Sequence, residues 1–181
     1  MSWMCSKCGV LHDSVPDSYA FNAPWPWYLT SDKTRNATSF LSENECVLEG
    51  QDYFVAGCLE IPVIGREAPF IWGVWVSLSK DNFDRQRLLR TDPARVQEPS
   101  YFGWLSSRIQ VYPDTILLKT HVHSRPVGMK PYIELEPTDH PLAVDQRNGI
   151  TVERVQQIAE AMQHKWLHPE WDKKGFYGGA S

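Results

Sequence analysis

Long apolar runs are missing from this sequence of 181 residues. No stretch approaches the roughly 18 uninterrupted apolar residues that a membrane helix requires. The first ten residues also lack the basic start and the apolar segment of a secretion signal. We therefore expect a cytoplasmic protein with no membrane association.

A surplus of basic charge is missing as well. The 18 lysines and arginines are outnumbered by 22 aspartates and glutamates, so the formal net charge is -4. Nucleic-acid binding usually depends on a basic surface, and we expect no nucleic-acid partner. The chain also has no Gly-x-Ser-x-Gly, His-Glu-x-x-His or Walker sequence, which disfavours the commonest hydrolases, metalloproteases and nucleotide-binding enzymes.

The composition that is present suits one globular domain. Hydrophobic residues make up 42% of the chain and charged residues 22%, which is enough apolar material for a core at this length. We predict a single domain over residues 3–168, which includes an N-terminal metal hook and a Trp/Pro-rich arm. A mobile tail is predicted over residues 169–181. The oligomeric state cannot be inferred from these features.

Six segments favour β-structure, and the turn residues between them suit an antiparallel sheet. They are residues 45–49, 52–63, 69–79, 101–111, 115–123 and 130–136. The third segment is the clearest, because its apolar residues alternate with those of the opposite face. We predict that it is a central strand with Trp72 and Val74 in the core.

Two helices are predicted to pack on this sheet. Ser79 is a suitable N-cap for the first, and Thr151 for a second that carries apolar residues on one face as far as Trp166. Residues 13–38 contain three prolines and two tryptophans, which predicts a wrapping arm with room for a short helical turn. The expected fold class is α+β: a mainly antiparallel sheet of about six strands packed by two helices, with an N-terminal Cys-x-x-Cys metal hook.

The sharpest local signal is the pair Cys5 and Cys8, followed by Gly9. Two thiolates three positions apart can hold one metal ion, and the glycine permits the tight turn behind them. Zinc is the ion that this pattern favours, with His12 as the nearest further ligand. The remaining ligand is open, with His121, His123 and His140 as candidates.

Two other interpretations of these thiols stay open. They could pack as small, half-buried hydrophobic side chains. A thioredoxin-like redox pair is disfavoured, because that motif should follow a strand and open a helix. Cys46 and Cys58 lie in apolar, strand-like runs, where we expect inert core thiols.

A second group of polar residues could line a pocket. It consists of His121, His123, Arg125, Asp139, His140 and Gln146. The two histidines of the strand point the same way and could reach one ion or one substrate. An exposed face of an edge strand is the favoured explanation, because no third ligand motif accompanies them. If residues 115–123 and 130–136 form a hairpin, His123 lies near Lys130 and roughly 20 Å from His140, unless the chain folds back after Pro137.

Several separated motifs together resemble the bacterial family called domain of unknown function 2199. They are Cys5-x-x-Cys8-Gly9-x-x-His12, Leu59-Glu60-Ile61-Pro62-Val63, Trp72-Gly73-Val74-Trp75-Val76, Tyr101-Phe102-Gly103, residues 137–143 and Gly149-Ile150-Thr151. The likeness spans roughly residues 3–165. It implies a small bacterial cytoplasmic protein whose N-terminal cysteines form a metal hook, and it implies no activity.

Two functions are compatible with these features. The first is a zinc-stabilised protein-binding module, for which the eight tryptophans would supply contact area. One version of it is an immunity-type protein that blocks a toxin from a neighbouring cell. The alternative is an enzyme with a polar cleft built from His123, Asp139 and His140.

Overall fold

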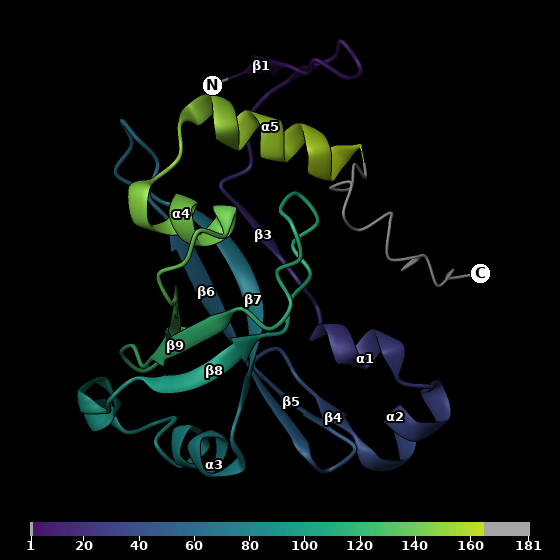
Figure 1. Cartoon of the computed structure of the whole chain (residues 1–181), viewed down its shortest axis with the longest axis vertical. Coiled ribbons are helices and arrows are strands. Elements are labelled where there is room, and N and C mark those ends of the chain that lie inside the picture. Colours follow the sequence, from purple (N-terminus) through teal and green to yellow (C-terminus); the bar gives the residue numbers. More distant parts are fainter. Residues whose placement is uncertain (1, 165–181) are drawn as a thin grey trace.

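The structure, a computed structural model, describes residues 2–164 (Figure 1). The elements in chain order are β1 (Trp3–Met4), β2 (Leu11–His12), β3 (Ser18–Ala20), α1 (Trp25–Leu29), α2 (Asp32–Thr38), β4 (Phe40–Leu41), β5 (Glu45–Leu48), β6 (Asp52–Ile61), β7 (Phe70–Leu78), α3 (Lys80–Leu88), the 3-10 helix η1 (Pro93–Gln97), β8 (Tyr101–Leu105), β9 (Lys119–His123), β10 (Tyr132–Leu135), α4 (Pro141–Asn148) and α5 (Val152–Gln163).

The larger of the two sheets in this part of the chain closes on itself. Its strand order is β3-β7-β8-β9-β10-β6-β5-β4, and β6 also pairs with β7. Strands β6 to β10 therefore form a five-stranded barrel. Neighbours along the barrel are antiparallel except β10 and β6, which run parallel and join at the pair Tyr132 and Cys58. Strand β3 adds a second parallel pairing, on the outer edge of β7.

Two glycines allow the strands of the narrow barrel to approach one another. A Cβ atom on Gly57 would lie 2.5 Å from the side chain of Ile133, and one on Gly103 would lie 2.4 Å from the carbonyl oxygen of Ser77. Real Cβ atoms do not tolerate such contacts. The barrel radius therefore depends on the missing side chains at these two positions.

The main core fills the barrel. Strand β7 sends alternate side chains inward, and Trp72, Val74 and Val76 are fully buried. Helix α5 closes one end, because Val155 and Ile158 belong to the same apolar cluster. The prediction that Trp72 and Val74 share the buried face of a central strand is confirmed.

A second, smaller core lies outside the barrel beneath the N-terminal arm. It contains Cys46, Phe54 and Trp75, and Phe21 and Trp27 of the arm pack against it. The indole N–H of Trp75 donates to the carbonyl of Phe21 at 2.8 Å. Burial raises the pKa of the Cys46 thiol to about 12, which agrees with the expected inert core thiol.

The predicted fold class is right in its α+β character and wrong in detail. The larger sheet has eight strands rather than about six, and it closes on itself. It is mainly antiparallel, as predicted, with parallel pairings only between β10 and β6 and between β3 and β7 among the described residues. The described chain also holds five α-helices rather than two. The arm forms α1, where Pro26 lies in the first turn, a position that suits proline. It also forms α2, which Ser31 caps by accepting a hydrogen bond from Thr34 N–H.

Helix α4 was not predicted. It starts at Pro141 after His140, whose Nδ1 accepts a hydrogen bond from the backbone N–H of Leu142 at 3.2 Å. The strand predicted over residues 101–111 is also too long, because β8 ends at Leu105. Beyond β8, the backbone N–H of Trp75 donates to the hydroxyl of Ser107 at 2.8 Å. At this point a side-chain oxygen accepts the hydrogen bond that a backbone carbonyl would accept in a continuing strand.

Several local predictions are confirmed. Strands β5 and β6 form a hairpin whose turn residues Glu49 and Gly50 have positive φ angles. Ser79 and Thr151 accept the capping hydrogen bonds of α3 and α5.

The predicted domain boundary at residue 168, the tail over 169–181 and Trp166 lie outside the described residues. Among the helices that are described, none is long and apolar enough to cross a membrane.

Replacing Trp72 with alanine tests the barrel core. We expect Trp72→Ala to lower the free energy of unfolding by about 3–5 kcal/mol, because it empties a fully buried aromatic site. Trp104→Ala is the matched control, since Trp104 is 38% exposed and should cost less than about 1.5 kcal/mol. Denaturant titration of both variants measures the difference, and equal losses would contradict the assigned faces.

Candidate metal centre

The N-terminal hook is a two-stranded ribbon with a tight turn. Strand β1 pairs with β2 so that Trp3 lies opposite His12. Between the strands, the backbone N–H of Gly9 donates to the carbonyl of Cys5 at 3.0 Å, and Gly9 adopts a φ of 68°. The turn folds Cys8 back towards Cys5, which is the role expected of a glycine at this position.

The hook brings three metal-ligating side chains together. One ligand atom from each of Cys5, Cys8 and His12 lies within 4.8 Å of the others. The Sγ atom of Cys8 is 3.9 Å from Nε2 of His12. Cys5 is buried, whereas Cys8 is exposed and His12 is half-buried. This group is the one that the sequence spacing predicted.

A side chain from the other end of the described chain contacts Cys5. Nε2 of His164, which follows the last turn of α5, lies 3.2 Å from Sγ of Cys5. A tetrahedral zinc ion with ligands at about 2.0–2.3 Å would set its donor atoms roughly 3.3–3.8 Å apart. The contacts of His164 with Cys5 and of His12 with Cys8 are close to this spacing.

Hydrogen bonds shift the Cys5 thiol towards the thiolate. Burial by itself raises its pKa, but hydrogen bonds from the backbone N–H groups of Cys8 and Lys7, together with the side chains of His164 and Cys8, outweigh burial. The net result is a pKa lowered from 9.0 to about 6. A thiolate is the form of cysteine that binds metals.

Helix α5 also holds the hook through a carboxylate. Both oxygens of Glu160 accept hydrogen bonds from Ser6, one from the backbone N–H and one from the hydroxyl, each at 2.6 Å. These bonds lower the pKa of Glu160. Within the hook, Trp3 stacks on the His12 ring at a centroid distance of 4.8 Å and donates from its indole N–H to the carbonyl of Ser14.

The surroundings of Cys5 and Cys8 differ from those of a redox motif. The residues between them form a turn, and the chain continues into β2 rather than into a helix. A thioredoxin-like pair depends on a helix N-terminus to activate its first thiolate. The donor set of two thiols and one or two imidazoles instead suits a tetrahedral ion such as zinc.

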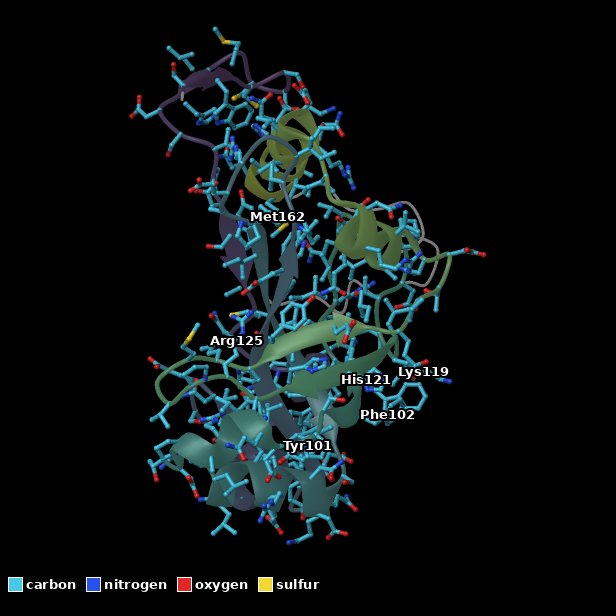
Figure 2. All side chains as sticks on the ribbon, turned by 90° about the vertical axis from the view of Figure 1, so that its left-hand side faces the viewer. Tyr101, Phe102, Lys119, His121, Arg125 and Met162 are labelled. Atoms are coloured by element: carbon cyan, nitrogen blue, oxygen red, sulfur yellow. The ribbon has the colours of Figure 1, made fainter. Side chains whose placement is uncertain are left out.

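The other predicted site residues lie away from this cluster. His121 and His123 are on the outer face of β9, where His121 faces Glu136 at 3.5 Å and His123 contacts Glu134 at 2.7 Å. The pairing of Tyr132 with His123 confirms the hairpin that was expected for these strands. In Figure 2, His121 lies beside Lys119 and Phe102 on this face.

Arg125 and Gln146 line a common cavity of about 410 Å³, which also includes Glu60 and Tyr132. The Arg125 guanidinium forms a 2.7 Å ion pair with Glu60. Gln146 is buried and completes the unpaired edge of β10, because its side chain accepts from Leu135 N–H and donates to a carbonyl of the same strand. These contacts give Gln146 a structural role.

Asp139 and His140 belong to the loop before α4. Asp139 is exposed, and His140 caps the helix through Nδ1. The structure therefore brings Arg125 and Gln146 to one cavity, places His121 and His123 on the neighbouring sheet face, and uses His140 at a helix start.

Sequence reasoning missed His164. It considered His121, His123 and His140 as further ligands that the fold could bring to the hook. No spacing rule connects residue 164 with residues 5–12, since the contact depends on how α5 crosses the hook. The predicted helix after Thr151 supplied a partial signal, because its last turn carries His164.

Comparison with known proteins identifies the family of the chain. A search of curated proteins and a search of solved structures each found no match. Residues 4–150 match the family described as an uncharacterized protein conserved in bacteria, DUF2199. The match includes Cys5, Cys8 and His12 and stops before His164. The chain, with its barrel and its N-terminal Cys-Cys-His cluster, belongs to this bacterial family DUF2199.

Proposed function

We propose that this protein is a zinc-stabilised protein-binding module. The observation that carries the proposal is the convergence of Cys5, Cys8 and His12, whose ligand atoms lie within 4.8 Å of one another. In the proposed centre His164 is the fourth ligand. A full set of four protein ligands leaves no open position for a substrate, which is typical of structural zinc.

A structural role agrees with the position of the centre. The hook has little core of its own, because the apolar cluster that contains Trp3 and Cys5 is completed by Ala159 of α5 and by Val15 among the described residues. Strands of two residues are marginal without support. A metal ion bound by the hook and by His164 would fix the hook against α5, and Glu160 would fix the intervening turn.

The surface proposed for binding is the outer face of β8 and β9. Phe102 and Trp104 are 39% and 38% exposed and form an edge-to-face pair with ring centroids 5.1 Å apart. Phe102 also contacts the ring of His121. Exposed aromatic side chains surrounded by polar groups are typical of the energetic centre of a protein interface.

The charges around this aromatic pair indicate the chemistry of the partner. Lys119 and Glu136 lie 3.8 Å apart beside it, and His123 with Glu134 extends the polar border. The partner we propose is a protein that presents an apolar side chain flanked by charges of both signs. An immunity-type partner, which would be a toxin, remains a prediction within this class.

The alternative enzyme requires His123, Asp139 and His140 to converge in a cleft. His123 instead contacts Glu134 on the outer sheet face, and His140 accepts the N-terminal hydrogen bond of α4. Each histidine therefore has its own local partner, which does not support the shared cleft that the enzyme requires. The metal centre and the aromatic face support the binding module better.

Metal analysis tests the centre. Protein purified without chelator should contain about one zinc ion per chain, and Cys5→Ser should lose it together with at least about 2 kcal/mol of folding free energy. Cys46→Ser is the matched control, because that thiol is buried outside the hook. It should keep its zinc. Negligible zinc in the parent protein, or full zinc in Cys5→Ser, would refute the proposal.

Cobalt substitution tests His164 separately. A Co²⁺ ion with two thiolates and two imidazoles should give the intense visible absorption of a four-coordinate site. His164→Ala should change this spectrum and weaken Co²⁺ binding by about tenfold or more, because a protein ligand is lost. His121→Ala should change neither. An unaltered spectrum in His164→Ala would leave a three-residue site and exclude His164 as a ligand.

Site-specific crosslinking tests the binding face. A photoreactive residue at position 104 should give a discrete protein adduct in the bacterium, and Phe102→Ser should abolish it because a central aromatic contact is worth about 2 kcal/mol. The same residue at position 88 is the control, since Leu88 is 73% exposed on α3. Equal adducts at both positions, or adducts independent of Phe102, would contradict the assignment.

A further inference from the structure

A cavity of about 290 Å³ lies between η1, α3 and the loop that joins β9 to β10. Figure 1 shows this loop and the coil that contains η1 at the same side of the barrel. Strands β5 and β6 supply its floor through Glu45, Val55 and Ala56. None of the residues discussed for the metal centre or the binding face lines it.

The cavity contains a buried cation that has no acidic partner. Arg95 is 6% exposed. One terminal guanidinium nitrogen donates to the carbonyl of Arg90 at 2.9 Å, whereas Nε is buried and has no hydrogen-bond partner. Among the described residues, no carboxylate forms an ion pair with Arg95. Buried guanidinium groups are normally paired, because an unpaired buried charge is costly.

A second unsatisfied donor lines the same cavity. The side-chain nitrogen Nε2 of Gln86, on α3, is buried and has no hydrogen-bond partner. Arg90 and Lys130 add positive charge to the lining. A local excess of positive charge and two orphaned donors at the cavity wall are complementary to an oxyanion, which accepts several hydrogen bonds at once. Both nitrogens are closed to solvent, so the side chains of Arg95 and Gln86 would turn towards a bound oxyanion.

The remaining lining restricts the kind of oxyanion. Glu45 contributes a carboxylate whose side chain is only 12% exposed and which lies 3.8 Å from Arg87. A doubly charged phosphate would be repelled by it more strongly than a singly charged group. Val55, Val127 and Met129 provide apolar contact area, and the planar fork of a guanidinium matches a carboxylate.

We propose that this cavity binds a small monocarboxylate with an apolar body, held at its carboxylate by Arg95 and Gln86. Its volume suits a metabolite smaller than a drug-sized ligand. The loop residues Val127 and Met129, which are 47% and 51% exposed, would cover the apolar part. This binding site is independent of the proposed zinc centre and of the aromatic face.

Titration with hexanoate tests the proposal, with amide chemical shifts as the readout. Hexanoate should give saturable shifts at residues 86, 95 and 127–130 of the full chain. Hexanamide, its neutral counterpart, and inorganic phosphate should bind at least about tenfold more weakly, because a charge-assisted hydrogen bond or the apolar contact is lost. The absence of saturable hexanoate shifts, or equal binding of hexanamide, would overturn the proposal. Phosphate binding that matches hexanoate would overturn the assignment of a monocarboxylate.

Variants identify the residues that bind. Arg95→Met should weaken hexanoate binding by about tenfold or more, because it removes the guanidinium that would hold the carboxylate. Gln86→Leu provides the same test if Arg95→Met does not fold. Arg66→Gln removes a guanidinium that lines a different cavity and should bind hexanoate normally. Parental affinity in both Arg95→Met and Gln86→Leu would overturn the proposal.

Discussion

Closure of the barrel is the constraint on which the other features depend. The long β6 and β7 ladder joins nine residue pairs, but it becomes part of a closed wall only where β10 meets β6 at Tyr132 and Cys58. Gln146 then supplies side-chain hydrogen bonds along the rest of the β10 edge. Closure removes the free edges that an open sheet would expose, and it fixes which face of every strand is inside.

That division of faces positions both candidate surfaces. Because Tyr101, Gly103 and Leu105 point inward, Phe102 and Trp104 must point outward, beside the outward histidines of β9. Tyr101 and Leu105 belong to the same apolar cluster as Val155 and Ile158 of α5, so this helix is fixed by the barrel core on one side. Its other side then offers Ala159, Glu160 and His164 to the N-terminal hook.

Features that depend on neighbouring residues could be predicted from the sequence. The spacing of Cys5, Cys8 and His12, the alternation around Trp72 and the caps at Ser79 and Thr151 all arise within a turn or a strand. Features that depend on distant pairing could not. The contact of His164 with Cys5, the closure at Tyr132 and the burial of Arg95 each require the complete fold.

Proline led to a different error. In the arm, proline was taken to resist regular structure, yet Pro26 occupies the first turn of a helix, where its missing N–H costs nothing. Pro141 does the same in α4, which was not predicted from the sequence. Strands of two or three residues such as β3 and β4 were also missed. They exist because β7 and β5 offer edges to pair with, and too few residues are involved to leave a periodic signal.

The contact between Cys5 and His164 has a consequence for the unfolded chain. A metal ion that bridges these residues would enclose a loop of about 160 residues. In the chain-entropy description, a cross-link of that span lowers the conformational entropy of the unfolded ensemble. The corresponding gain in the free energy of unfolding is about 5 kcal/mol at room temperature, an upper value that assumes a rigid link. The ion would therefore act as a reversible cross-link between the two ends of the described chain. Metal supply, rather than any change in the barrel itself, would set how long the whole chain resists unfolding and proteolysis.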